Sequence, residues 1–184
     1  MRIPPQAKPV FTGEIYTVYQ WPQTMFDGST ATFEMIRRAD TAEVIAVADG
    51  KIWYAEQEQP FKGKYISFFG GRIEPGETAL AGAARELLEE AGLSGTLELL
   101  QDTMPLSKME WTNHIFVARD CHFTEKQNPD PGEKITLKSC TFDELISKLL
   151  NQEIKTSPNF IISIYNAVYR DPSKLEEFKQ KLGL

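Results

Sequence analysis

The sequence has little histidine and cysteine, and neither residue forms a recognisable motif. Two histidines and two cysteines occur among 184 residues, and none of the four stands at a metal-ligand or redox-motif spacing. We therefore expect Cys121 and Cys140 to be buried thiols, and His114 and His122 to have structural roles. Neither a disulfide framework nor a histidine-based metal site is indicated.

Clusters of basic residues and long apolar runs are also absent. The net charge is −6, and no Lys/Arg cluster is suited to follow a nucleic-acid backbone, so nucleic acid is not an expected partner. The longest mostly apolar run, Phe160 to Tyr169, has about half the length of a membrane span. The segment MRIPPQAKPV has no apolar targeting core. We expect no membrane partner and a cytoplasmic location.

What is present is an ordinary globular composition, organised around one segment. With 41% hydrophobic and 25% charged residues, a chain of this length suits one domain with appendages. The central segment runs from Gly71 to Leu93 and reads GRIEPGETALAGAARELLEEAGL. Its spacing predicts a helix over 78–91, with Thr78 as N-cap and Gly92 as a left-handed C-terminal residue. The predicted core-facing stripe consists of Leu80, Ala84, Leu87, Leu88 and Ala91.

Three carboxylates lie on the opposite side of this predicted helix. Glu86, Glu89 and Glu90 follow an i, i+3, i+4 spacing, which makes them neighbours on about one turn of surface. Like charges at this distance repel, so a divalent cation is expected among them, and Arg85 can pair with Glu89 one turn on. An acidic face that only contacts solvent is the alternative.

The loop before the helix is suited to an anionic ligand. Phe69-Gly70-Gly71 and the turn 74–77 lead into the helix start. Glycines let a backbone pass close to a ligand, and a helix N-terminus favours phosphate through its free N–H groups and dipole. The segment therefore combines a phosphate-binding approach with a cation-binding face.

The rest of the chain predicts strands followed by helices. Residues 1–9 are expected to be extended or loosely ordered, because they are rich in proline. Strands are predicted over 13–21, 30–37, 42–48, 52–57, 65–69, 96–101, 114–123 and 135–142, with an irregular loop over 124–134. Helices are predicted over 143–151, 157–170 and 172–182. This order implies a mixed sheet between helices.

The central segment resembles the signature of the Nudix hydrolases. That pattern requires Gly, five residues, Glu, seven residues, Arg-Glu, an aliphatic residue, any residue, Glu-Glu, any residue, Gly and an aliphatic residue. The matching positions are Gly71, Glu77, Arg85, Glu86, Leu87, Glu89, Glu90, Gly92 and Leu93. The resemblance implies an α/β fold of the α+β Nudix type, with a mixed β-sheet sandwiched between helices and an N-terminal antiparallel β extension.

The resemblance also implies the chemistry, which is hydrolysis of a nucleoside diphosphate derivative with Mg²⁺, for which Mn²⁺ could substitute. Octahedral oxygen ligands suit Mg²⁺, so Glu86 and Glu90 are the expected direct ligands, with the Gly70 carbonyl. Glu89 is expected as a ligand or as a base that orients water, and Arg85 as a group holding the neighbouring carboxylates. Glu77 is expected to support the metal ligands rather than to act as a base.

A looser resemblance, over roughly residues 14–170, is to the ADP-ribose pyrophosphatase branch. It implies a division into an N-terminal extension (1–40) and a Nudix domain (41–184), a homodimer held by the N-terminal sheet, and Glu133 as a general base on the 124–134 loop. The implied substrate-binding residues are Phe26, Phe33, Arg37, Arg38, Glu58 and Gly71, and Glu58 belongs to the segment Glu58-Gln59-Pro60-Phe61. The chain departs from the branch at Phe69-Gly70-Gly71 and at Met104-Pro105-Leu106.

Three functions follow as hypotheses. The first is a Mg²⁺-dependent pyrophosphatase that converts ADP-ribose or a related nucleoside diphosphate sugar to a nucleoside monophosphate and a sugar phosphate. A pyrophosphatase of nucleoside triphosphates is the alternative within the enzyme class. A Nudix-fold sensor that binds without cleaving is the alternative outside it, and the complete set of Glu86, Glu89 and Glu90 argues against it.

Overall fold

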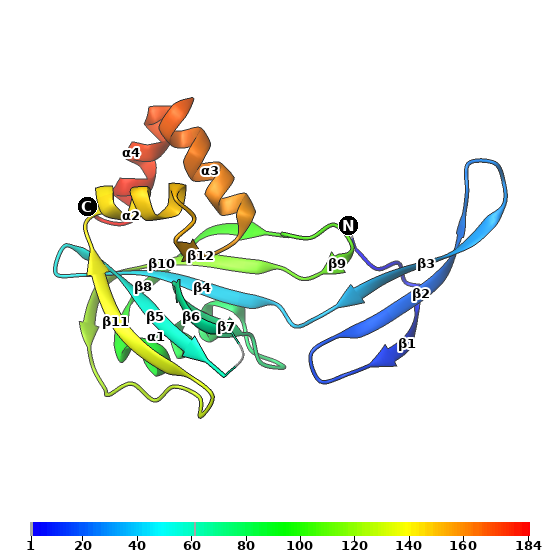
Figure 1. Ribbon diagram of the computed structural model, residues 1–184, viewed down its shortest axis with the longest axis horizontal. Helices are drawn as coiled ribbons and strands as arrows, with labels where there is room; N and C mark the ends of the chain where they lie inside the picture. Colours follow the sequence, from blue (N-terminus) through cyan, green and yellow to red (C-terminus); the bar gives the residue numbers. More distant parts are fainter. Residues whose placement is uncertain (1, 61) are drawn as a thin grey trace.

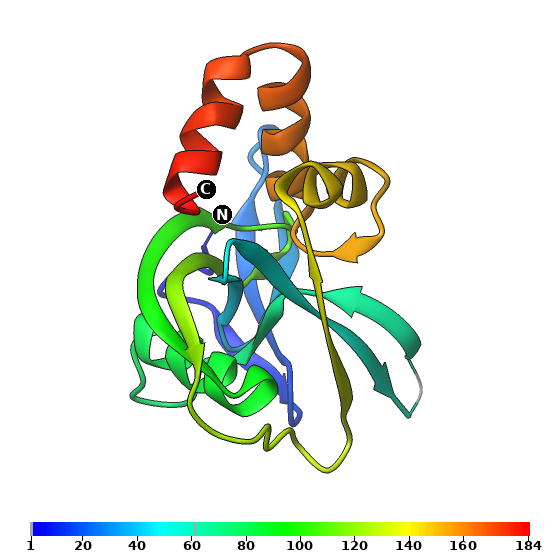
Figure 2. The same cartoon turned by 90° about the vertical axis from the view of Figure 1, so that its left-hand side faces the viewer.

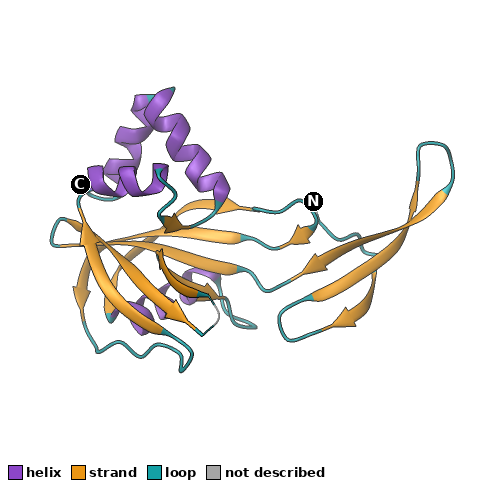
Figure 3. Ribbon diagram, viewed as in Figure 1, coloured by secondary structure: helices purple, strands orange, loops and turns teal. Residues whose placement is uncertain are grey.

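The computed structural model describes residues 2–60 and 62–184. Two sheets lie side by side, a small one built mainly from the N-terminal residues and a larger one that carries the helices (Figure 1). Strands make up most of both parts, and the helices cover the larger sheet alone (Figure 3). No helix within the described residues is long and apolar enough to cross a membrane.

The N-terminal sheet has the strand order β1-β2-β3-β9. β1 (Lys8–Thr12), β2 (Thr17–Thr24) and β3 (Thr30–Arg37) are antiparallel, and the short β9 (Met109–Glu110) runs parallel to β3. The predicted strand over 13–21 was placed too early, because Gly13 donates its N–H to the Tyr16 carbonyl (2.9 Å) and closes a turn. This turn returns the chain so that β1 pairs with β2, which makes part of the predicted loose N-terminus a strand.

The larger sheet is mixed and surrounds β4 (Thr41–Ala48). β4 runs parallel to β10 (Asn113–Phe123) and antiparallel to β5 (Lys51–Gln59) and β7 (Phe69–Arg72). β6 (Gly63–Ser67) and β11 (Lys134–Cys140) pair with β5, β8 (Leu93–Thr103) pairs with β10, and β12 (Ile154–Lys155) pairs with β6. The predicted mixed sheet is confirmed.

The predicted strand over 65–69 divides in two where the chain changes partners. β6 pairs with β5, while β7 pairs with the first half of β4. Phe68 and Phe69 stand at the division, and both are buried, on opposite faces of the sheet. After the division, Gly70 and Gly71 pair with Glu43 and Ala42 of β4, and Gly71 lies next to Glu86.

Helices cover both faces of the larger sheet (Figures 1 and 2). α1 (Ala79–Ala91) packs on one face, where Ala83, Leu87 and Ala91 join a core cluster with β4 and β10. α2 (Phe142–Leu150), α3 (Pro158–Tyr169) and α4 (Pro172–Lys181) cover the other face around Phe160 and Phe178. The strand predicted to continue to residue 142 ends at Cys140, because Thr141 and Glu144 form a capping box that starts α2.

Candidate active site

α1 brings the three box glutamates to one end of the sheet. Its N-terminus is capped as predicted, since the Thr78 hydroxyl accepts the Ala81 N–H (3.1 Å), and Gly92 ends it with φ of 66°. The predicted core stripe was wrong at Leu80, which is 51% exposed, and at Ala84, which is also exposed. The helix is rotated about its axis so that Ala83, rather than Ala84, meets the sheet.

This rotation buries Glu90, which is only 3% exposed, so the alternative of an acidic face that only contacts solvent does not hold for this residue. Its carboxylate accepts the Gly70 N–H (2.8 Å) and the Gln57 side-chain amide (3.3 Å), both of which are neutral donors. Burial, and to a smaller extent the negative charges of Glu86 and Glu133, raise the pKa of Glu90 to about 8. A carboxylate in this setting favours a cation as its partner.

The two glycines of β7 are required by close approaches. Gly70 has φ of 151°, and a Cβ there would lie 2.0 Å from the Ala42 carbonyl oxygen. A Cβ on Gly71 would lie 2.6 Å from a carboxylate oxygen of Glu86. The glycine pair therefore lets the backbone lie directly against both β4 and the acidic cluster.

Arg85 joins the remaining carboxylates. Its Nη1 donates to Glu86 (2.8 Å) and Glu89 (3.0 Å), as predicted for Glu89, and its Nε and Nη2 donate to Glu77 (3.1 Å each). The hydrogen bond from Arg85 holds the pKa of Glu77 below its ordinary value. For Glu86, burial outweighs Arg85 and raises the pKa. Arg85 thus places a positive charge between Glu86 and Glu89.

Glu133 lies with these residues, at the end of the 124–134 loop. Its carboxylate accepts the Gln59 side-chain amide (2.8 Å), and its N–H donates to the Asp130 carbonyl (2.8 Å). The start of the loop is fixed on α1, because the Asn128 N–H donates to the Glu89 carbonyl (2.8 Å). Glu133 lines the same cavity as Glu86, Glu89 and Glu90, so the structure places it beside the acidic cluster.

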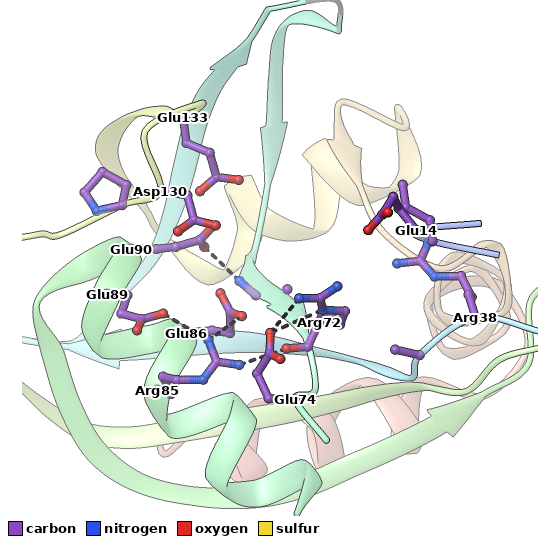
Figure 4. Close-up of a pocket in the computed structure, with 15 residues that line it drawn as sticks. Glu14, Arg38, Arg72, Glu74, Arg85, Glu86, Glu89, Glu90, Asp130 and Glu133 are labelled. Carbon is purple, nitrogen blue, oxygen red and sulfur yellow. Dashed lines mark hydrogen bonds and ion pairs between the residues drawn. The ribbon is translucent and has the colours of Figure 1, made fainter. Parts of the chain in front are cut away.

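A cavity of about 730 Å³ connects these groups with the N-terminal sheet. Glu86, Glu89, Glu90 and Glu133 lie on one side of it, and Arg38 and Glu14 lie on the other (Figure 4). The full lining comprises Glu14, Ile15, Arg38, Ala39, Gly70, Gly71, Arg72, Glu74, Arg85, Glu86, Glu89, Glu90, Pro129, Asp130 and Glu133. The β1–β2 turn therefore forms a wall of the site in the same chain.

Four predicted substrate-binding residues do not line this cavity. Arg37 pairs with Glu110 (3.0 Å), and Phe33 packs on Trp21 with a centroid distance of 5.1 Å. Phe26 is fully exposed between β2 and β3, and Glu58 lies in β5. Phe61, which follows Glu58 in the expected segment, lies outside the described residues. The sequence predicted no site role for Glu14, Ile15, Gln57 or Asp130, because no motif marks them, and it predicted Gln59 only as part of the segment that begins at Glu58.

The residues present suit a divalent cation, although they are not arranged around one. Oxygen donors from Glu86, Glu89, Glu90 and the Gly70 carbonyl are the chemistry that Mg²⁺ prefers, and the carboxyl of Glu90 pairs with no cationic side chain among the described residues. Among residues 2–60 and 62–184, no three acidic, histidine or cysteine side chains converge as a preformed metal site. The ion pairs of Arg85 with Glu86 and Glu89 account for this, since they direct both carboxylates to the guanidinium.

Comparison with known proteins agrees with this geometry. Residues 37–160 match the NUDIX domain family. The chain belongs to the Nudix family. Among curated proteins, this Nudix chain is 24% identical over 151 residues to the ADP-ribose pyrophosphatase of Bacillus subtilis (strain 168), covering 79% of this chain and 81% of that protein. It is also 24% identical over 178 residues to the methanol dehydrogenase activator of Bacillus methanolicus, covering 87% and 89% respectively.

A solved structure confirms the Nudix fold. The crystal structure of an ADP compounds hydrolase superposes with a TM-score of 0.70 at 20% sequence identity, and the match covers 91% of this chain and 95% of that one. The chain therefore has the Nudix fold, and in sequence it is similar to an ADP-ribose pyrophosphatase.

Proposed function

We propose that this Nudix protein hydrolyses ADP-ribose or a related nucleoside diphosphate sugar in a Mg²⁺-dependent reaction, giving a nucleoside monophosphate and a sugar phosphate. The observation that carries the proposal is that the carboxylates of α1, the Gly70-Gly71 strand and Arg38 all face one cavity. Its volume of about 730 Å³ lies in the range of small-molecule sites. The likeness to an ADP-ribose pyrophosphatase supports the substrate class.

Glu86 and Glu90 would hold the metal with the Gly70 carbonyl, and Glu89 would be a further ligand or would orient water. A bound Mg²⁺, or Mn²⁺ in its place, would neutralise the diphosphate oxygens and make a water molecule more acidic. Glu77 does not line the cavity and would act by holding Arg85. Arg85 would keep its ion pairs with Glu86 and Glu89 while no metal is bound, and these carboxylates would turn to the metal when it binds.

Glu133 is proposed as the general base. Its carboxylate lies on the same cavity as the α1 glutamates and is oriented by the Gln59 amide (2.8 Å). An anionic carboxylate with a neutral donor on one oxygen leaves its remaining lone pairs free to take a proton from water. Gly71 would let the diphosphate pass close to the backbone.

Arg38 is proposed to bind a phosphate of the substrate. Of the arginines that line the cavity, Arg72 pairs with Glu74 and Arg85 with three carboxylates, but Arg38 makes no ion pair with any described residue. Its Nε is buried and without a hydrogen-bond partner in that same part of the chain. Because Arg38 lines the cavity and its positive charge has no described carboxylate partner, an anionic ligand there would supply one.

We also propose a homodimer joined through the N-terminal sheet, with residues 1–40 as an extension and 41–184 as the Nudix domain. Exposed apolar side chains on this sheet and its turns support it: Val10, Phe11, Ile15, Tyr16, Met25 and Phe26. The proposed roles of Phe26, Phe33, Arg37 and Glu58 in binding would then depend on the assembled dimer. The two free, buried cysteines support the predicted cytoplasmic location.

A substrate panel with Mg²⁺, read by chromatography of the products, tests the proposal. Hydrolysis of ADP-ribose or a nucleoside diphosphate sugar to two monophosphates, abolished by chelation, is the expected result. Glu90→Gln should abolish it, while Glu98→Gln, on the exposed strand β8, should not. Release of pyrophosphate from triphosphates would favour the alternative enzyme, and binding without turnover would favour the sensor.

A further inference from the structure

Trp111 lies against the cavity arginine without lining the cavity itself. The Arg38 guanidinium carbon is 4.9 Å from the centre of the Trp111 ring, the geometry of a cation–π contact. Trp111 is half-buried in the segment between β9 and β10. No described carboxylate forms an ion pair with Arg38, so the indole faces a guanidinium that no carboxylate holds.

The indole is itself fixed by a chain of polar groups. Its Nε1–H donates to the Thr41 hydroxyl (3.0 Å), and that hydroxyl donates to the Asn113 side-chain oxygen (2.8 Å). Asn113 is 1% exposed, and its side chain hydrogen-bonds the carboxyl of Glu43. A buried network of this kind has little freedom, because each group that moves leaves another unsatisfied.

The backbone beside Trp111 is fixed to the same place. The Thr112 N–H donates to the Asp40 carboxylate (2.7 Å), and the Thr41 N–H donates to the Thr112 carbonyl (3.0 Å). Trp111 is thereby attached to the start of β4 in two ways, through its indole ring and through the backbone of the adjacent Thr112. The start of β4 also pairs with β7, where Gly70 and Gly71 meet the acidic cluster.

The neighbouring Arg37 also lies over an aromatic ring, but it differs from Arg38 in having a carboxylate partner. Arg37 is neutralised by Glu110 (3.0 Å) and lies over the Tyr19 ring at 4.8 Å. Arg38 has the aromatic contact without the carboxylate. An aromatic face orients a guanidinium while leaving its N–H groups free for an anion, whereas a carboxylate would compete for them.

We propose that Trp111 is a positioning residue, whose indole, held by Thr41 and Asn113, orients Arg38 to bind a phosphate of the ligand in the cavity. This rests on the proposed function, in which that ligand is a nucleoside diphosphate sugar. Without the indole, Arg38 would have to give up rotamer freedom when the ligand binds, and affinity would fall. The reacting groups on α1 would keep their places, so the chemical step would be affected little.

The test is a double-mutant cycle between Trp111→Leu and Arg38→Ala, read by kinetics on the best substrate of the panel. Trp111→Leu should raise KM about tenfold with kcat within about threefold, as expected from losing a partly desolvated cation–π contact. In the Arg38→Ala background the same substitution should change KM by less than about twofold, because Trp111 acts through Arg38. Trp111→Phe, which keeps an aromatic face, should restore most of the affinity.

Two further variants separate positioning from general destabilisation. Thr41→Val removes the hydroxyl that holds the indole and should raise KM in the same direction by a smaller factor, even if Trp111→Leu folds poorly. Trp53→Leu is the matched control, since Trp53 is also half-buried and donates its Nε1–H to the Ala48 carbonyl (3.3 Å), but it packs on Phe123 away from the cavity. It should lower stability without raising KM.

Binding of ADP by calorimetry provides a readout that does not depend on turnover. If no nucleoside diphosphate sugar is hydrolysed, the proposed function fails, but an ADP affinity that depends on Arg38 and Trp111 non-additively would still support the positioning role. Additive effects of Trp111→Leu and Arg38→Ala on KM and on ADP binding would overturn it. So would a loss confined to kcat.

Discussion

Replacing Glu90 with glutamine should make the metal-free protein more stable in alkali while removing its activity. The wild-type carboxyl is buried between neutral donors, and its pKa is raised to about 8 from an ordinary 4.5. The folded state therefore binds this proton more tightly than the unfolded state, so stability falls as pH rises between these two values. Glutamine at this position would carry no charge at any pH.

The size of the effect follows from the interval between the two pKa values. From 4.5 to about 8, at ~1.4 kcal/mol per pH unit, the full cost is at most ~5 kcal/mol, and relaxation of the site should reduce it to about 1–3 kcal/mol. Glutamine can still accept the Gly70 N–H, but its own amide would face that of Gln57. Losing that hydrogen bond costs about 1 kcal/mol.

Urea unfolding with a chelator, at about pH 5 and about pH 9, measures both terms. At the lower pH, Glu90→Gln should be slightly less stable than the wild type, and at the higher pH it should be more stable. Added Mg²⁺ should stabilise the wild type at the higher pH and the variant much less, because ligand binding to the folded state adds stability. A stability difference that is the same at both pH values would refute the reasoning.

Glu77→Gln is the control of opposite sign. The Arg85 hydrogen bond holds the pKa of Glu77 low, so its contribution is present above the ordinary carboxyl pKa and is lost as pH falls through the lowered value. This variant should therefore be destabilised most near neutral pH and above. Together the two substitutions distinguish a buried, uncompensated carboxyl from one that is paired.

Three further predictions concern the chemistry and the assembly. Glu133→Gln should lower kcat by about 10²-fold with a small change in KM, as expected from losing a general base, and retention of more than about a tenth of the wild-type kcat in steady-state kinetics would assign proton removal elsewhere. Gly71→Ala should reduce kcat while circular dichroism shows a folded protein. The new Cβ would lie 2.6 Å from a carboxylate oxygen of Glu86 and would push that carboxylate out of place. Normal turnover would contradict the close approach. Light scattering should give the mass of a dimer for the wild type. Phe11 and Val10 are 61% and 53% exposed, and replacing both with aspartate should give a monomer. A wild type that is monomeric at all concentrations would contradict the proposed interface.

Local patterns could be predicted from the sequence, and long-range placements could not. The N-cap at Thr78, the left-handed Gly92 and the Arg85–Glu89 pair depend on residues within one or two turns, so spacing alone defines them. Burial of Glu90 depends instead on Gly70 and Gln57, which lie on two other elements, β7 and β5. Nothing within the helix sequence indicates that one of its three carboxylates is enclosed.

The contact between Arg38 and Trp111 illustrates the same limit. The two residues are distant in the chain and meet because β9 pairs with β3 and because the backbone of Thr112 is bonded at the start of β4. A two-residue strand such as β9 carries no periodicity that a sequence pattern could reveal. The cavity wall formed by Glu14 and Ile15 was missed because the turn before β2 was read as strand.

The change of strand partner between Ser67 and Phe69 has a consequence for how this family can vary in length. Removing one residue there would exchange the faces of Phe68 and Phe69 and draw Gly70 away from Glu90, since side chains alternate along a strand. The tip of the 129–132 loop has no such constraint, because a Cβ on Gly132 would meet nothing within 4 Å. Insertions and deletions among relatives should therefore gather at that loop and at the β1–β2 turn, where they would reshape the walls around the substrate while the acidic cluster keeps its place.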